Sequence, residues 1–216
     1  MLEEMSDFFE ARLQGYEEHM RKNIAFASDF YPETARLLPL HPGMQLLDLG
    51  CGTGLELDEI YGLCDSVKTT GIDLCLPMLN ELKRKPYAAH LQLIHGSYFD
   101  VPFGENCFDA AVSVESLHHF SADKKLPLYR KIYASLKENG VYAETDYAAA
   151  DDEEEAFYFS EYARLSKGAE PGKFHYDTPL TSKHTMELLR QAGFEEVKIC
   201  NQYENTALIM AKKKTL

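Results

Sequence analysis

The sequence predicts an α/β fold built around a largely parallel sheet, and three observations support this. Short apolar runs alternate with amphipathic segments from about residue 44 onward, a pattern typical of β–α units around a largely parallel sheet. A glycine-rich turn leads from the first of these runs directly into a helical segment. The 216 residues, 45% of them apolar, suit one large domain with a substantial core.

The apolar runs are the expected strands of the parallel sheet. They cover residues 44–49, 67–72, 91–94, 108–114 and 141–145. Two further runs near the C-terminus, 197–203 and 206–211, are separated only by Glu204 and Asn205. So short a connection predicts an antiparallel hairpin.

The segments between the strands have helical spacing of their apolar residues. They predict helices at 53–63, 77–84, 126–137 and 181–192. Pro77 and Pro127 suit first helical turns, where a missing N–H costs nothing. Asn139 and Gly140 are expected to end the third of these helices.

Two segments lie outside the β–α repeat. Residues 1–40 are expected to form a helical cap with a break near Gly15, followed by a domain at 41–216 that carries an insertion at about 148–180. Five acidic residues, 151–155, open this insertion and precede several aromatic ones. The insertion is either a helix whose acidic first turn matches its dipole or a lid whose aromatic side chains cover a substrate.

The charge balance ranks the possible partners. With 22 Lys and Arg against 35 Asp and Glu, the net charge is −13, and three basic residues run together only at 83–85 and 212–214. Nucleic acid and anionic membranes are therefore disfavoured. No apolar run approaches the roughly 18 residues that span a bilayer, and the acidic N-terminus is unlike a signal peptide. We therefore expect a cytoplasmic protein, whose five scattered cysteines are reduced thiols.

The glycine-rich turn predicts a nucleotide-type ligand site. Residues 46–54, Leu-Leu-Asp-Leu-Gly-Cys-Gly-Thr-Gly, run from a buried strand into a helix. Glycines let a ligand approach bare backbone, and the helix start offers unpaired N–H groups. Asp73 ends the next strand, about 20 residues on, where a carboxylate accepts hydrogen bonds from ribose hydroxyls. This much fits a dinucleotide or another adenosine cofactor.

Charge distinguishes between these two ligands. A pyrophosphate at the turn would face Asp48 and Glu56, with no Lys or Arg nearby in the sequence. Like charges this close cost on the order of several kcal/mol at an effective dielectric constant of about 20. A ligand with an ammonium and a sulfonium group would instead be attracted. S-adenosylmethionine is such a ligand.

Four motifs in order make the sequence resemble the class I S-adenosylmethionine-dependent methyltransferases over about residues 40–213. They are 47–54 (LDLGCGTG), 71–73 (GID), 95–103 (HGSYFDVPF), and 108–113 (FDAAVS) with 117–120 (LHHF). The resemblance implies a seven-stranded, doubly wound, Rossmann-like fold with a C-terminal antiparallel hairpin. It also implies methyl transfer to a small-molecule acceptor, with S-adenosylhomocysteine as product.

The resemblance also assigns roles around the cofactor. Backbone at Gly50 and Gly52 would lie along the methionine moiety, with Asp48 near its amino group. Asp73 would hold the ribose hydroxyls, and Leu74 would pack on the adenine.

The third motif departs from the family pattern. Ser97 stands where the family usually has an aspartate that accepts from the adenine amino group, so this contact is expected to be weakened or altered. The backbone N–H of Tyr98 would still donate to the ring. Cys51 and Val114 complete the predicted cofactor site.

Candidate catalytic groups follow from the reaction. Methyl transfer is an in-line displacement, so the protein mainly positions the acceptor and excludes water, and it needs a base only if the acceptor arrives protonated. His118 and His119 follow the fourth strand, where they either act on the acceptor or serve as a backbone partner and a residue of the cleft edge. With no third ligand at suitable spacing, no metal site is expected. Glu115 contacts either the acceptor or solvent, and Tyr16 either closes the methionine pocket or packs in the cap.

The acceptor itself is expected to be a small molecule. Aromatic residues near the fifth strand and in the insertion either suit a small, even cationic, acceptor or simply pack: Tyr147, Tyr158, Tyr162 and His175. Residues 113–116, Ser-Val-Glu-Ser, replace the Asn-Pro-Pro-Tyr type of stretch that handles a flipped base. Two alternatives remain open, a non-catalytic S-adenosylmethionine-binding regulatory protein and an NAD-dependent oxidoreductase. The expected assembly is a monomer or a homodimer.

Overall fold

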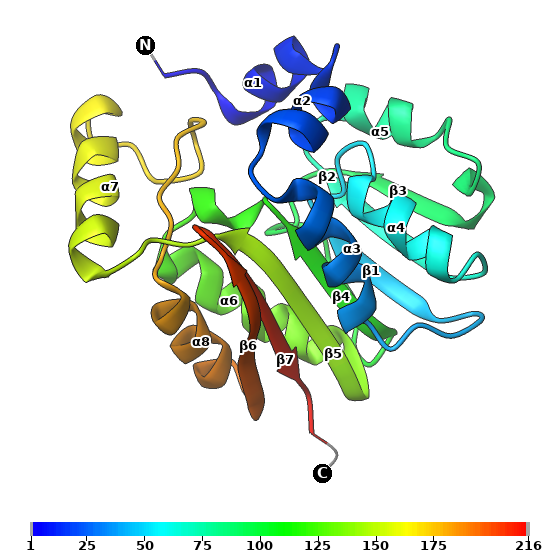
Figure 1. Cartoon of the computed structure of the whole chain (residues 1–216). Coiled ribbons are helices and arrows are strands. Elements are labelled where there is room, and N and C mark those ends of the chain that lie inside the picture. The colour runs from blue at the N-terminus through cyan, green and yellow to red at the C-terminus, as the bar shows by residue number, and fades with distance from the viewer. Residues whose placement is uncertain (1, 215–216) are drawn as a thin grey trace.

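The computed structural model describes residues 2–214 and contains a seven-stranded sheet between layers of helices (Figure 1). The strand order is β3-β2-β1-β4-β5-β7-β6, and only β7 runs antiparallel to its neighbours. The strands are β1 (Gln45–Leu49), β2 (Lys68–Asp73), β3 (Leu91–His95), β4 (Phe108–Val114), β5 (Leu136–Tyr147), β6 (Glu196–Tyr203) and β7 (Thr206–Lys212). The predicted doubly wound fold and C-terminal hairpin are confirmed.

Helices cover both faces of the sheet. They are α1 (Met5–Arg12), α2 (Tyr16–Asn23), α3 (Ala27–Leu37), α4 (Leu55–Leu63), α5 (Leu76–Leu82), α6 (Ala122–Ser135), α7 (Asp152–Leu165) and α8 (Ser182–Gln191). Helices α3, α4 and α5 pack on one face, and α6 and α8 on the other. Figure 1 shows α1 and α2 above the carboxyl ends of the parallel strands. Across residues 2–214, no helix has the length and apolar character needed to cross a bilayer.

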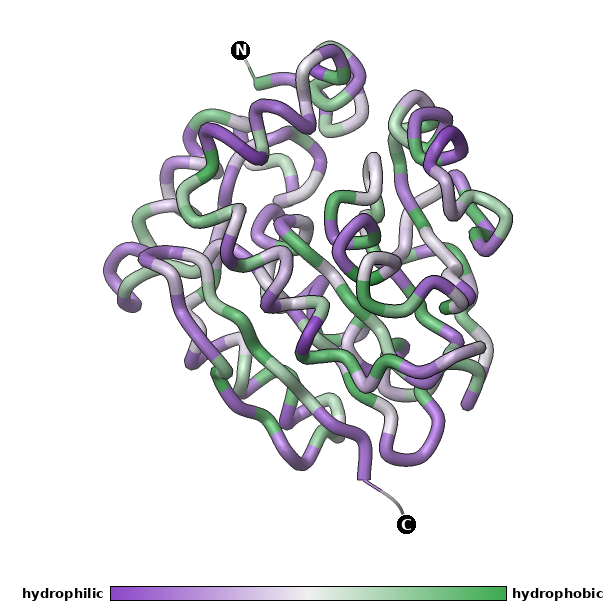
Figure 2. The backbone as a smooth tube through the Cα atoms, turned by 45° about the vertical axis from the view of Figure 1, so that its right-hand side comes forward, coloured by the Kyte–Doolittle hydropathy of each residue, from purple (hydrophilic) through white to green (hydrophobic). Residues whose placement is uncertain are grey.

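The central strands are buried on both faces, as expected of a parallel sheet between two helix layers. In β1, Leu46 belongs to the core under α3 and α4, and Leu47 to the core under α6 and α8. In β4, Val112 belongs to the core under α3 and α4, and Ala111 to the core under α6 and α8. Figure 2 shows hydrophobic residues along these inner strands and hydrophilic ones along the outer helices. This rigid core holds the carboxyl ends of β1, β2 and β4 in fixed positions.

The predicted end of the helix before the fifth strand is wrong. Helix α6 stops at Ser135, and Pro127 lies inside it rather than in its first turn. Leu136 is fully buried and pairs with Phe108 as the first residue of β5. Asn139, with φ of 60°, therefore lies in an irregularity where β5 shifts its register against β4. The Asn-Gly pair bends a strand instead of ending a helix.

The cap and the insertion have different relations to the core. Helix α3 buries Phe30 and Tyr31 in the core beside α4, so the last part of the segment 1–40 belongs to the helix layer. The domain division at residue 40 stays a prediction. In the insertion, the Asp151 side chain caps α7 by accepting from the Glu154 N–H at 2.8 Å, which matches the expected acidic helix start.

Candidate active site

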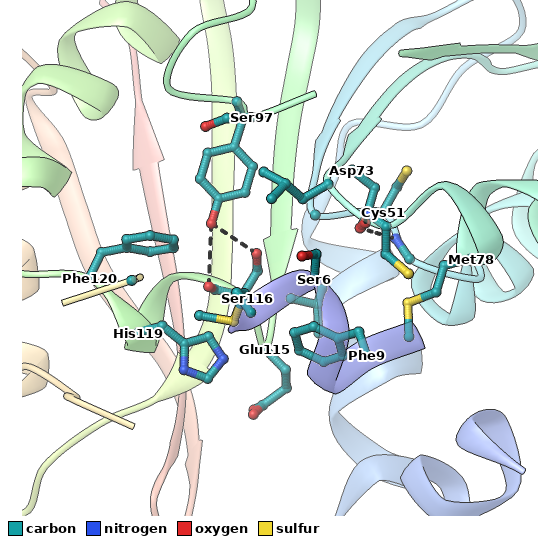
Figure 3. A pocket seen from close by; sticks show the side chains of 18 of the residues that line it. Ser6, Phe9, Cys51, Asp73, Met78, Ser97, Glu115, Ser116, His119 and Phe120 are labelled. Carbon is teal, nitrogen blue, oxygen red and sulfur yellow. Dashed lines mark hydrogen bonds between the residues drawn. The ribbon is translucent and has the colours of Figure 1, made fainter. Parts of the chain in front are cut away.

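A cavity of about 390 Å³ lies over the carboxyl ends of β1, β2 and β4. Its position at the change of strand order between β1 and β4 is the usual ligand position in such sheets. Figure 3 shows Asp73, Cys51 and Met78 at one end of it, and His119 and Phe120 at the other. Most of the predicted site residues line it: Tyr16, Gly50, Cys51, Gly52, Asp73, Leu74, Ser97, Tyr98, Val114, Glu115 and His119. Asp48 and His118 lie behind its wall.

The glycine turn forms one wall and needs its glycines. Gly50, Gly52 and Gly54 have φ of 78°, 47° and 84°, in the left-handed region that favours glycine. A Cβ at Gly50 would lie 2.2 Å from Ser116 Oγ and 2.9 Å from Ser116 Cβ. The turn therefore brings bare backbone against the cavity wall formed after β4.

Asp73 connects β2 to the glycine turn. Its Oδ2 accepts from the Gly52 N–H at 2.8 Å, and its Oδ1 accepts from the Cys75 N–H at 2.7 Å. Burial raises the pKa of Asp73, although these two donors stabilise the ionised form. Leu74, next in the chain, is 45% exposed and lines the cavity. The predicted ribose and adenine contacts are therefore adjacent to the turn.

Two buried carboxyl groups beside the turn face each other, and three of their oxygens accept from no N–H or hydroxyl group among residues 2–214. Both side-chain oxygens of Asp48 and Oε1 of Glu56 are buried in this state. Burial raises the pKa of Asp48 to about 7, and burial followed by the charge of Asp48 raises the pKa of Glu56. Asp48 was expected beside the methionine amino group, but it lies behind the wall, and Glu56 lines the cavity instead. The sequence position of Glu56, two residues past the last glycine, could have predicted that its side chain lines the cavity.

The Ser97 and Tyr98 side chains of the third motif contact nearby protein groups. Ser97 Oγ accepts from the Phe99 N–H at 3.2 Å, and the Tyr98 hydroxyl lies 3.2 Å from Ser116 Oγ. Asp100 also lines this wall. A carboxylate is thus present three residues after the position where the family motif usually has one, which the sequence comparison missed.

The two adjacent histidines have different environments. His118 Nδ1 lies 2.5 Å from Asp146 Oδ1, and its Nε2 lies 3.5 Å from Asp177 Oδ1. Burial acts to lower the pKa of His118, but the Asp146 carboxylate outweighs it and raises the value to about 9. His119 lines the cavity, and its Nδ1 lies 3.3 Å from the carbonyl oxygen of Tyr176.

The expectation that no third ligand lies near the histidine pair is wrong. The chain folds Asp177 against both rings, and ligand atoms of His118, His119 and Asp177 lie within 4.8 Å of one another. Glu115, His118 and Asp146 form a second such group. Both groups have the spacing to hold a metal ion. His118 Nδ1 is already bonded to Asp146 and His119 Nδ1 to the Tyr176 carbonyl, so we assign no metal to them.

The pH dependence of stability should reflect His118. A histidine whose pKa rises from 6.5 to about 9 on folding contributes stability that is fully present below pH 6.5. This contribution is lost as the pH rises through 9, so the free energy of unfolding should fall on the order of 1 to 3 kcal/mol over that interval. Urea unfolding at a series of pH values measures this fall. His118→Gln should remove it, and an equal fall in that variant would contradict the assignment.

Glu115 and Tyr16 complete the cavity wall. Glu115 has φ of 47°, and its Oε1 accepts from the Thr206 hydroxyl at 3.3 Å. Burial raises the pKa of Glu115 to about 7. Burial and then Glu56 raise the pKa of Tyr16, so its hydroxyl stays protonated. Figure 3 shows Glu115, His119 and Phe9 facing the same part of the cavity.

The cavity is covered by two chain segments that bond to each other. Residues 170–173 line it together with Met5, Ser6 and Phe9 of the N-terminal segment. Met5 N–H donates to the Lys173 carbonyl at 3.3 Å, and His175 N–H donates to the Glu3 carbonyl at 3.0 Å. We call residues 3–9 and 170–175 the roof.

The aromatic residues expected at the acceptor have packing roles. None of them lines the cavity: Tyr147, Tyr158, Tyr162 and His175. The hydroxyls of Tyr147 and Tyr158 lie 2.7 Å apart, and His175 stacks on Phe8 with ring centroids 3.3 Å apart. The part of the insertion that covers the cavity is therefore the loop after α7.

Moving the roof should slow turnover. Gly172 has φ of 89°, and a Cβ there would lie 2.1 Å from Phe120 Cε1, so Gly172→Ala must displace either the loop or the Phe120 ring that lines the cavity. Gly168→Ala is the matched control, because its φ of 83° is similar and nothing among residues 2–214 lies within 4 Å of the added Cβ. We expect at least about a tenfold greater loss of turnover for Gly172→Ala, since water exclusion and acceptor positioning depend on the closed cover. Equal rates for the two variants would show that the roof does not limit catalysis.

Comparisons with known proteins agree with this geometry. Residues 46–140 match a family model described as a methyltransferase domain. Cycloartenol-C-24-methyltransferase of Arabidopsis thaliana is 30% identical over 186 residues, covering 83% of this chain and 52% of that protein. Residues 46–140 thus form a methyltransferase domain, and these matches support a class I S-adenosylmethionine-dependent methyltransferase.

Other relatives extend the comparison of this methyltransferase. Carboxy-S-adenosyl-L-methionine synthase of Campylobacter fetus subsp. fetus (strain 82-40) is 22% identical over 222 residues, covering 96% of this chain and 94% of that protein. Human N-acetylserotonin methyltransferase, solved in complex with S-adenosylmethionine, shares the fold with a TM-score of 0.65 and 20% identity, covering 88% of this chain and 53% of that one. The chain spans about half the length of the first curated relatives it matches.

Proposed function

We propose that the chain transfers the methyl group of S-adenosylmethionine to a small-molecule acceptor held in the cavity, with release of S-adenosylhomocysteine. One observation carries this proposal. Asp48 and Glu56 are buried carboxyl groups that interact with each other, three of their four oxygens accept from no N–H or hydroxyl group among residues 2–214, and they stand next to bare glycine backbone. Buried polar groups are normally paired, so this site suits a cationic ligand. The ammonium and sulfonium groups of S-adenosylmethionine meet that requirement.

The size and charge of the site support a small acceptor. A covered cavity of about 390 Å³ is within the ordinary range for small-molecule sites. A protein of net charge −13 is unsuited to a phosphate backbone. Relatives named as cycloartenol and O-methyltransferases point to the same class. A cytoplasmic location and a monomeric or homodimeric state remain predictions from the sequence.

The residues around the cavity have different roles in methyl transfer. When bound, S-adenosylmethionine supplies the methyl carbon and the sulfonium leaving group. Asp73 would orient the ribose, the backbone at Gly50 and Gly52 would hold the methionine moiety, and Glu56 with Asp48 would balance its positive charge. The protonated Tyr16 closes the methionine end, and the roof excludes water.

The test is transfer of a labelled methyl group. The purified chain is incubated with S-adenosylmethionine carrying a radioactive methyl group and a panel of small phenols, alcohols, amines and thiols. The proposal expects a labelled product with at least one acceptor and production of S-adenosylhomocysteine. S-adenosylhomocysteine binding without any transfer would favour the regulatory protein. NAD binding without S-adenosylmethionine binding would favour the oxidoreductase.

A further inference from the structure

We propose that His119 is the general base of the reaction, and that the acceptor is therefore a molecule whose attacking oxygen or nitrogen carries a proton to be removed. This inference rests on the methyl transfer proposed above, and it narrows the acceptor class. It follows from the hydrogen bonds and charges around the two adjacent histidines, which sequence alone treats as equivalent.

The hydrogen bond at Nδ1 determines the tautomer of His119. This nitrogen lies 3.3 Å from the Tyr176 carbonyl oxygen and 3.4 Å from Asp177 Oδ1. A carbonyl oxygen and an ionised carboxylate only accept hydrogen bonds, so Nδ1 must carry the proton. In the neutral ring Nε2 then has a free lone pair. A base whose far nitrogen is held by a fixed acceptor is the usual arrangement for proton abstraction.

The position of His119 allows this lone pair to be used. Its side chain is only 3% exposed, yet it lines the cavity. Figure 3 shows the ring facing Glu115 and Phe9 at the end of the cavity opposite Asp73. His119 is therefore at the acceptor end and away from the predicted ribose contact.

Neighbouring charges keep His119 neutral. Both ring nitrogens of His118 face carboxylates, those of Asp146 and Asp177, so His118 is the protonated member of the pair. The two rings lie 4.0 Å apart between centroids, and a second positive charge there is unfavourable. Burial lowers the pKa of His119 well below 6.5, and the charge of His118 lowers it further.

Groups on the other elements packed against His119 both lower and raise its pKa. His175 in the roof and Lys125 of α6 also lower the pKa of His119. The Tyr176 carbonyl bonded to Nδ1 acts in the opposite direction. Asp177 lies beside the same nitrogen, and Glu115, whose own pKa is raised to about 7, lines the same cavity. Burial and the neighbouring positive charges together favour the neutral ring, which is the form that accepts a proton at pH 7.

The proton and electron changes balance with this base. The acceptor proton moves to His119 Nε2 while the acceptor oxygen or nitrogen forms a bond to the methyl carbon. The carbon–sulfur bond breaks, and its electron pair stays on sulfur, which becomes a neutral thioether. The positive charge of the sulfonium is thus replaced by an imidazolium at His119, which returns its proton to solvent when the roof opens.

The charge states can be measured without knowing the acceptor. The full chain is labelled with ¹⁵N-histidine and saturated with S-adenosylhomocysteine, and long-range ¹⁵N–¹H correlation spectra are recorded at pH 7. His118→Gln and His119→Gln assign the two rings. We expect His119 to have a proton on Nδ1 only, and His118 to have protons on both nitrogens. A proton on Nε2 of His119, in either charge state, would overturn the proposal.

Turnover provides the second test, with an acceptor found by the labelled-methyl panel. His119→Gln should lower kcat about 10²- to 10⁴-fold, the usual contribution of a general base, with little change in the KM for S-adenosylmethionine. His90→Gln, at an exposed histidine outside the cavity, is the control and should leave kcat unchanged. An unchanged kcat in His119→Gln would overturn the proposal. If the wild type binds no S-adenosylhomocysteine, the proposed function fails instead, and the spectra of the unliganded chain still report the tautomer.

Discussion

Gly50→Ala should weaken S-adenosylhomocysteine binding at least about 100-fold, or about 2.7 kcal/mol. Alanine in this left-handed conformation costs roughly 1 to 3 kcal/mol of strain. The added Cβ would also lie 2.2 Å from Ser116 Oγ and 2.9 Å from Ser116 Cβ. Rotation of the serine side chain moves its Oγ but not its Cβ, so the backbone of the turn or of Ser116 must shift, and both line the cavity. Isothermal titration calorimetry measures the loss.

Gly43→Ala is the matched control for this substitution. Gly43 has φ of 76°, close to the 78° of Gly50, but nothing among residues 2–214 lies within 4 Å of its added Cβ. It precedes β1 and does not line the cavity. Both variants should lose some thermal stability, and only Gly50→Ala should lose binding. Equal affinities in the two variants would mean that the turn does not hold the cofactor.

Asp73→Ala should weaken S-adenosylhomocysteine binding by about 1.5 to 3 kcal/mol, because charge-assisted hydrogen bonds to the ribose are lost. Removal of the carboxylate also frees the Gly52 and Cys75 N–H groups, which it binds at 2.8 and 2.7 Å. The midpoint of thermal unfolding should therefore fall as well. Calorimetry and a thermal melt separate the two effects.

Two further variants make the Asp73 prediction sharper. Asp73→Asn keeps the shape and one acceptor oxygen but removes the charge, so it should lose affinity with a smaller loss of stability. Asp65→Ala removes an exposed carboxylate outside the cavity and should change neither quantity. Wild-type affinity in a folded Asp73→Ala would reject the ribose role.

The part of the site predicted best from sequence is the part formed by continuous segments. The turn at Gly50 and Gly52 and the acid Asp73 belong to neighbouring β–α units, so their spacing along the chain determines their spacing in the fold. Asp48 does not line the cavity itself. It interacts with the side chain of Glu56, which does line it from the start of α4.

The acceptor end could not be predicted in the same way. Asp177 reaches His118 across 59 positions of sequence, and the roof joins Glu3 to His175 from opposite ends of the chain. Neither contact leaves a periodic or spacing signal. The opposite charge states of His118 and His119 depend on these distant partners, so the pair alone could not reveal them.

The predicted boundary between α6 and β5 was wrong because a distant contact determines it. Asn-Gly is a frequent helix end, and local preference placed the stop there. Pairing of the buried Leu136 with Phe108 extends the strand back to residue 136 and moves Asn139 into an irregularity of β5. Tertiary pairing therefore overrode the local signal.

The central claim is that the turn after β1 accepts a cationic adenosine derivative and rejects a phosphorylated one, because Asp48 and Glu56 are buried beside it. Calorimetric titration of the same wild-type preparation with S-adenosylmethionine and with NAD tests this most directly. We predict saturable binding of S-adenosylmethionine at one site per chain and no measurable heat with NAD. Saturable binding of NAD, with none of S-adenosylmethionine, would contradict the account.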